Sequence, residues 1–177
     1  MLAYLLRNAL NIMVFCLLLA SSMTWAAPPQ TVPQVDLARY LGKWFEIGHL
    51  PMFFQRQCVA NTTAEYIKRE DGRIGVINRC ATKDGSYDES VGQANVVEGT
   101  GNAQLKVSFF WPFRGDYWVI GLDPDYRWAL VASPDRDHLW LLSRTRELPQ
   151  AESEKALDIA RAQGFKLDKW SPTPQTE

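Results

Sequence analysis

The chain has 177 residues, the length of one domain, and 46 % of them are hydrophobic, which is enough to bury a sizeable core. Its formal net charge is -1, and lysine and arginine form no run. Because such a chain offers no positive surface to attract a phosphate backbone, we exclude nucleic-acid binding.

A secretory signal peptide is predicted at the N-terminus. Arg7 supplies one positive charge, residues 12–20 form an apolar run too short to span a bilayer, and small residues follow. We expect cleavage after Ala26, which removes residues 1–26 and exports the rest to the periplasm or beyond. Cys16 lies inside the apolar run without small residues before it, so we interpret it as part of the signal core; attachment of a lipid anchor to Cys16 is the alternative.

The exported chain is expected to begin with an extended tether at residues 27–35 and a short turn at residues 36–40. A first strand follows over residues 41–47. In it, Gly42 permits a tight turn, and Trp44 begins an alternation that marks one end of whatever the sheet encloses.

The next loop, residues 50–57, is the most apolar loop in the chain. We expect Met52, Phe53 and Phe54 at the rim of the open end of the sheet. There they either pack down as a lid or touch a membrane or a partner.

Seven further strands are joined by short turns rich in Gly, Pro and Asp. We expect them at residues 59–68, 73–80, 89–98 and 104–111, then after residues 112–115, between the turns at 123–125 and 133–135, and at residues 139–145. Eight strands joined in sequence order predict an all-β fold, an up-and-down antiparallel barrel without a free edge.

The hydrophobic period changes after Pro149. Residues 152–163 predict one amphipathic helix that stops at Gly164 and needs a sheet to lie on. The eighth strand is apolar on both faces, which suits a helix packed on the outside of the barrel. Residues 165–170 predict a short closing strand, and residues 172–177 a loose tail.

Three stretches, in this order and at this spacing, resemble the lipocalins. They are the Gly-x-Trp stretch at residues 41–47, the stretch at 116–126, and the last strand, which ends in Arg144. The resemblance covers residues 36–171 and is nearest to the bacterial lipocalin branch, close to apolipoprotein D and the plant temperature-induced lipocalins. We expect Gly42, Trp44 and Arg144 to be structural, with the arginine plane against the indole at the closed end of the barrel.

A barrel of eight strands leaves room for one small ligand, and each buried methylene of an acyl chain contributes about 0.8 kcal/mol. Tyr117, Phe109 and Trp140 are the preferred ligand contacts, because aromatic faces accept an acyl chain. Alternation from Trp44 and Arg144 places these candidate ligand-binding side chains toward the interior: Glu46, Tyr66, Val107, Phe109, Tyr117, Val119 and Trp140.

Two cysteines remain after export, Cys58 and Cys80, and they flank a predicted hairpin. In an oxidising compartment we expect a disulfide, which stabilises the fold by about 3 kcal/mol in the chain-entropy model. Two free buried thiols are the alternative.

No nucleophile elbow, phosphate loop, zinc-protease motif or Cys-x-x-Cys pair occurs in the sequence. His49 and His138 show no metal-ligand spacing, so we expect no catalytic group, metal or cofactor. The expected function is therefore that of an exported carrier of a fatty acid, lysophospholipid or similar amphiphile. The resemblance implies a role in storing, transporting or repairing envelope lipids, with transient membrane contact, as a monomer or homodimer. An enzyme using the same cavity, or a protein whose rim binds a partner chain, is the alternative.

Overall fold

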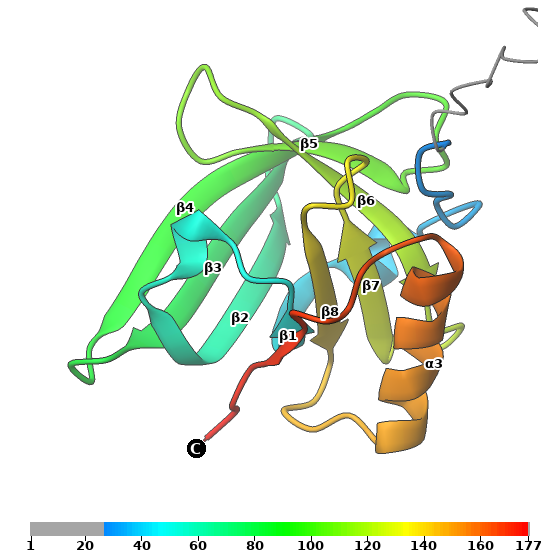
Figure 1. Ribbon diagram of the computed structural model, residues 1–177. Coiled ribbons are helices and arrows are strands. Elements are labelled where there is room, and N and C mark those ends of the chain that lie inside the picture. Colours follow the sequence, from blue (N-terminus) through cyan, green and yellow to red (C-terminus); the bar gives the residue numbers. More distant parts are fainter. Residues whose placement is uncertain (1–26, 177) are drawn as a thin grey trace, which may run out of the picture.

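A computed structural model describes residues 27–176, and the predictions for the signal peptide and Cys16 lie outside these residues. In the described part, nine strands form one sheet in the order β2-β3-β4-β5-β6-β7-β8-β1-β9, and a further pairing of β1 with β2 closes the barrel (Figure 1). All neighbouring strands are antiparallel. The predicted up-and-down barrel of eight strands is confirmed, and β9 is an addition to it.

The elements have the following bounds in chain order: α2 Leu37–Tyr40, β1 Gly42–His49, the 3-10 helix η1 Phe53–Gln55, β2 Cys58–Lys68, β3 Ile74–Thr82, β4 Tyr87–Val96, β5 Gln104–Ser108, β6 Gly115–Leu122, β7 Trp128–Ala132, β8 Leu139–Ser143, α3 Gln150–Ala162 and β9 Ser171–Pro172. In the described chain, no helix has the length and apolar character needed to cross a bilayer.

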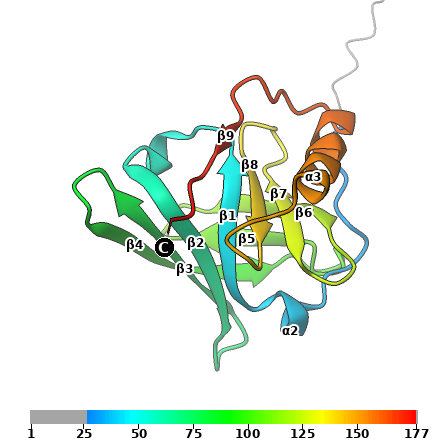
Figure 2. The same ribbon diagram turned by 90° about the horizontal axis from the view of Figure 1, so that it is seen from below.

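The barrel has two different ends. The short helix α2 lies at one end, which we call the closed end, and β9 lies near the other, the open end (Figure 2). Because the strands alternate in direction, the loops after β1, β3, β5 and β7 all emerge at the open end.

Trp44 and Arg144 meet at the closed end. The indole of Trp44 is fully buried, and the guanidinium carbon of Arg144 lies 3.7 Å from the ring centroid. Trp44 Nε1 donates a hydrogen bond of 2.8 Å to the carbonyl oxygen of Tyr40. Gly42 turns the chain into β1 with a φ of 90°, which glycine adopts without strain.

Two hydrophobic clusters share the strands of the sheet. One fills the barrel interior, and the other lies between the barrel and α3. In β8, Leu142 and Trp140 belong to the interior cluster, whereas Leu139 and Leu141 face the second cluster, where α3 contributes Ala156. The helix therefore packs on the outside of the barrel, as predicted (Figure 1).

The C-terminal residues differ from the prediction. Residues 165–170 form no strand, and residues 171–176, which we call the C-terminal segment, are not loose. Trp170 ends a turn, and its indole occupies the space beside Gly48, where a Cβ atom would lie 2.5 Å from the ring. The following residues then pair with β1 as β9.

The C-terminal segment fills a split between two barrel strands. β1 pairs with β2 only from Gly42 to Phe45, so the two strands present unpaired edges toward the open end. Thr173 N–H donates to the carbonyl of Ile47, and Asn61 N–H donates to the carbonyl of Pro174. The free edges of both strands explain why the segment is ordered.

One strand is shorter than predicted, because a turn begins where the prediction continued the strand. β5 ends at Ser108 instead of residue 111, because Phe113 N–H bonds back to the carbonyl of Phe110 and starts a turn around Pro112.

The predicted disulfide is confirmed: Cys58 of β2 is bonded to Cys80 of β3, with 5.4 Å between the Cα atoms.

Candidate functional site

Six of the seven candidate ligand-binding side chains belong to the interior cluster. Tyr66 and Val119 are buried within it, and the others pack against it, partly exposed: Val107, Phe109, Tyr117 and Trp140. Phe109 lies over Gly92, where a Cβ atom would come within 2.7 Å of the phenyl ring. The structure thus places these residues on the inner surface, and their contact with a ligand stays a prediction.

The seventh candidate, Glu46, also faces inward, since it is paired with Leu142 in the sheet and its side chain is buried. Its carboxylate accepts hydrogen bonds of 2.9 and 2.8 Å from Gln55 Nε2 and of 2.5 Å from Thr173 Oγ1, and lies 2.8 Å from His49 Nδ1. Glu46 therefore joins the loop after β1 to the C-terminal segment.

Sequence reasoning did not find Gln55 and Thr173, because neither forms a motif with Glu46. Gln55 also lies 3.4 Å from the indole nitrogen of Trp140, so the Glu46 network reaches a candidate ligand contact. Because both carboxylate oxygens of Glu46 already have hydrogen-bond partners, Glu46 stabilises the contact between the loop after β1 and the C-terminal segment at the open end.

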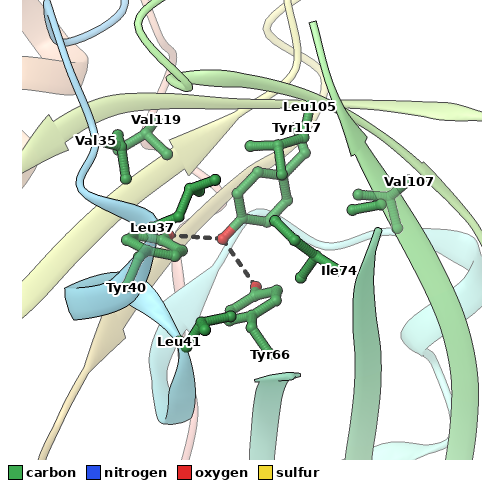
Figure 3. A pocket seen from close by; sticks show the side chains of 11 residues that line it. Val35, Leu37, Tyr40, Leu41, Tyr66, Ile74, Leu105, Val107, Tyr117 and Val119 are labelled. Atoms are coloured by element: carbon green, nitrogen blue, oxygen red, sulfur yellow. Dashed lines mark hydrogen bonds between the residues drawn. The ribbon is translucent and has the colours of Figure 1, made fainter. Parts of the chain in front are cut away.

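At the closed end of the interior lies a small apolar cavity, which we call the floor cavity (Figure 3). Its free volume is about 10 Å³. It is lined mainly by aliphatic side chains from the tether, from α2 and the residue after it, and from β3 to β6: Val35, Leu37, Leu41, Ile74, Ala94, Leu105, Val107 and Val119.

Three phenols complete the lining of the floor cavity: Tyr40 of α2, Tyr66 of β2 and Tyr117 of β6, here named the floor tyrosines. The Tyr117 hydroxyl lies 2.7 Å from that of Tyr40 and 2.8 Å from that of Tyr66 (Figure 3). Burial raises the pKa of all three phenols above the ordinary value for tyrosine. Tyr66 and Tyr117 were predicted to face inward; Tyr40 was missed because it lies in a predicted turn.

The loop after β1 forms one side of the open end. Phe53 and Phe54 are 73 % and 49 % exposed, whereas Met52 is buried and is not part of the exposed rim. Phe54 stacks on the ring of His138, which stacks on Trp140. The two histidines thus have packing and hydrogen-bonding partners, His138 between aromatic rings and His49 beside Glu46.

A second aromatic loop at the same end was missed by the sequence analysis, which extended the fifth strand into it. Phe110, Trp111 and Phe113 are 75 %, 87 % and 76 % exposed. Four aromatic residues and a proline within five positions were the signal, because so apolar a turn is unusual at a protein surface. We name these three, together with Phe53 and Phe54, the open-end aromatic residues.

Comparison with known proteins identifies the family. A family model described as "Lipocalin-like domain" matches residues 35–175. The chain is a lipocalin. Among its relatives, "Outer membrane lipoprotein Blc" of Escherichia coli (strain K12) is 43 % identical over 147 residues, which cover 81 % of this lipocalin and 82 % of the relative.

More distant relatives extend to plants and animals. "Temperature-induced lipocalin-1" of Arabidopsis thaliana is 34 % identical over 88 % of this chain and 87 % of its own length. "Apolipoprotein D" of Cavia porcellus is 33 % identical over 83 % and 80 % of the two chains. The predicted resemblance to the bacterial branch and to these two groups is confirmed.

Solved structures support the same fold. Insecticyanin from Manduca sexta superposes with a TM-score of 0.68 at 21 % identity, covering 85 % of each chain. The cockroach allergen Per a 4 gives a TM-score of 0.67 at 19 % identity, over 85 % of this lipocalin and 96 % of the allergen.

Between residues 27 and 176, His, Cys, Asp and Glu form no group of three or more that could hold a metal ion.

Proposed function

We propose that this lipocalin is an exported carrier that binds a fatty acid, lysophospholipid or similar amphiphile inside its barrel. The observation that supports this proposal is the interior cluster, in which apolar and aromatic side chains from all eight barrel strands face one another. Such a wall holds an acyl chain through apolar burial, at about 0.8 kcal/mol for each methylene. Val107, Phe109 and Trp140, which are partly exposed, are the side chains we expect to move when the chain enters.

The proposed location is the periplasm, in association with the outer membrane, and the proposed role is storage, transport or repair of envelope lipids. Relatives named "Outer membrane lipoprotein Blc" in four bacterial strains, at 40 to 43 % identity, support this location. The confirmed disulfide also fits an oxidising compartment.

The open-end aromatic residues support transient contact with a membrane surface. Five exposed aromatic side chains come from two loops at the end where the barrel interior would be entered. Indole and phenyl rings favour the interface between head groups and acyl chains. Arg56 and Arg114, both exposed in these loops, carry charge that suits anionic lipids.

The carrier proposal is tested by native mass spectrometry of the mature protein purified from its own envelope, followed by organic extraction. We expect a stoichiometric fatty acid or lysophospholipid, and the same spectrum distinguishes a monomer from a homodimer. An empty protein whose tryptophan emission also fails to respond to either lipid class would refute the carrier function.

Membrane contact is tested separately, by flotation with vesicles of phosphatidylethanolamine and phosphatidylglycerol. We expect the double variant Trp111→Ser and Phe113→Ser to lose vesicle binding. Val91→Ser, which alters a side chain 61 % exposed on β4, is the matched control and should retain it. Equal binding by the two variants would contradict a role for the open-end aromatic residues.

A further inference from the structure

The wall of the barrel contains a seam that no strand ladder closes. β1 and β2 pair as far as Phe45 and Thr63, and beyond this pair the C-terminal segment lies between them, toward the open end. On one side the segment pairs with β1 as β9 (Figure 2). On its other side it meets β2 at Asn61 and Thr62, and we call this contact the β2 seam.

Two prolines weaken the main-chain bonding across the β2 seam. Thr173 N–H points to β1 and donates a bond of 3.0 Å to the carbonyl oxygen of Ile47. Because the main-chain groups of successive residues in an extended chain point to opposite sides, those of Pro172 and Pro174 point toward β2. Proline has no N–H group, so neither residue can donate a bond there. Among the described residues, the bond of 2.8 Å from Asn61 N–H to the carbonyl oxygen of Pro174 is the one main-chain hydrogen bond across the seam.

The β2 strand is itself irregular at the seam. Its register against β3 shifts on both sides of Ala60. Asn61, the next residue, has a φ of 55°, which lies in the left-handed region. β2 therefore does not present a regular row of donors and acceptors to the C-terminal segment.

Side chains make the other hydrogen bonds across the seam. Gln175 Nε2 donates bonds of 2.9 Å to the carbonyl oxygen of Thr62 and of 2.8 Å to that of Glu46, and so joins the two strands. Asn61 Nδ2 donates a bond of 3.0 Å to Thr176 Oγ1. The residues of the C-terminal segment are exposed or half-buried, and none belongs to either hydrophobic cluster. A contact with so little apolar burial opens at a lower free energy than the paired strands of the wall.

The seam lies beside the space that the ligand would occupy. The Thr173 hydroxyl donates a bond of 2.5 Å to the carboxylate of Glu46, whose side chain faces the interior. Glu46 also accepts bonds from Gln55, whose amide oxygen lies 3.4 Å from the indole nitrogen of Trp140, a candidate ligand contact. Release of the C-terminal segment therefore opens the wall next to this contact.

The barrel has to open before an acyl chain can enter, because the floor cavity of about 10 Å³ has room for only one water-sized group. The loop after β1 covers part of the open end. Met52 is buried, Phe54 stacks on His138, and Gln57 Nε2 donates a bond of 2.8 Å to Asp88 of β4. This loop has the buried and stacked side chains that the C-terminal segment lacks, so the β2 seam is the less strongly held route into the barrel.

We propose that the C-terminal segment is a lateral gate: the β2 seam opens, the acyl chain of the amphiphile passes between β1 and β2, and the segment then closes the wall again. This rests on the proposed carrier function and assigns a route to its ligand. A lateral route suits an amphiphile, because the acyl chain crosses the wall while the polar head stays in water.

The test measures the association and dissociation rates of palmitic acid by stopped-flow tryptophan emission. Gln175→Ala removes both side-chain bonds that join the segment to the two strands. One hydrogen bond changes an equilibrium constant about fivefold, so we expect both rates to rise about fivefold or more. The dissociation constant should stay within about twofold of the wild-type value, because the same opening serves entry and exit.

Gln57→Ala is the matched control, because it removes the bond to Asp88 and loosens the loop over the open end. We expect its two rates to stay within about twofold of the wild-type rates. Wild-type rates in Gln175→Ala would overturn the proposal. So would a rise in Gln57→Ala that equals or exceeds the rise in Gln175→Ala, since the ligand would then pass through the open end.

A second pair of variants removes one hydroxyl each. Thr173→Val loses the bond to Glu46 and should raise both rates, whereas Thr100→Val, which loses a bond to the carbonyl oxygen of Val97 at the closed end, should not. Failure of the wild type to bind palmitic acid or a palmitoyl lysophospholipid would refute the carrier function and the gate with it. Normal binding with unchanged rates in Gln175→Ala would refute the gate alone.

Discussion

Replacing Arg144 by lysine tests how the closed end of the barrel is held. The Arg144 guanidinium donates hydrogen bonds of 2.5 to 3.2 Å to four carbonyl oxygens, three of residues just before β1 and one of Lys43 at its start, and its plane covers the Trp44 ring. A lysine keeps the charge, but its single nitrogen cannot reproduce the planar fork. We therefore expect two or more of the four bonds, and part of the cation–π contact, to be lost.

The expected cost is about 3 kcal/mol in the free energy of unfolding, from about 1 kcal/mol for each lost bond and a similar amount for the ring contact. For a domain of this size, that lowers the thermal midpoint by about 6 to 12 °C. Urea unfolding followed by tryptophan emission measures the loss, with an unchanged m value showing that the unfolding transition is otherwise the same.

Arg146→Lys is the matched control. Arg146 is exposed, and its guanidinium lies 5.2 Å from the Phe45 ring and donates one hydrogen bond of 2.7 Å to the carbonyl oxygen of Thr176. A lysine can also donate that single bond, so we expect a change within about 0.5 kcal/mol. If Arg144→Lys costs no more than Arg146→Lys, the hydrogen bonds and the stacked plane of Arg144 do not hold the closed end, and the reasoning is wrong.

Three further predictions concern the fold. Reduction of the disulfide between Cys58 and Cys80 should lower the free energy of unfolding, measured in urea, by about 3 kcal/mol. The double variant Cys58→Ser with Cys80→Ser should not respond to reductant, and an equal response in both proteins would be inconsistent with this prediction. Gly48→Ala should lower the free energy of unfolding by about 1 to 3 kcal/mol, because the new Cβ atom would meet the indole ring of Trp170. The Cβ atom of Gly115→Ala would meet no other atom, so this variant should lose far less, and equal thermal midpoints of the two variants would contradict the packing. Because the pKa values of the floor tyrosines are raised in the folded barrel, the free energy of unfolding should fall as the pH rises above about 10, where the unfolded chain releases protons that the folded barrel retains. Phenolate absorbance from these residues while tryptophan emission stays native would disprove this prediction.

The sequence predicted the barrel well because its strands and turns are specified locally. Alternating side chains identified the inner face of β8, and Gly-rich or Pro-containing turns located the strand ends to within a few residues. The fifth strand was placed too long because aromatic residues favour both strands and apolar turns. Pro112 showed that a turn follows the strand, but not that the turn begins before Trp111.

Contacts between distant segments could not be predicted in this way. Nothing near Glu46 in the sequence indicates that Thr173 bonds to it, since the two residues are 127 positions apart. Tyr40 joined the floor cluster only because the turn at α2 folds under the barrel. A pattern read along one element shows which face is apolar, but not which other element supplies the partner.

The position of the C-terminal segment sets the order in which the chain can complete its fold. Asn61 forms a hydrogen bond with Thr176, and the carbonyl oxygen of Glu46 accepts one from Gln175. These partners are synthesised and exported 115 and 129 positions later in the chain. Until then the upper edges of β1 and β2 are open, and open strand edges invite aggregation and proteolysis. Pairing along these edges therefore follows the synthesis and export of residues 171–174, and a chain that lacked them would leave both edges unpaired.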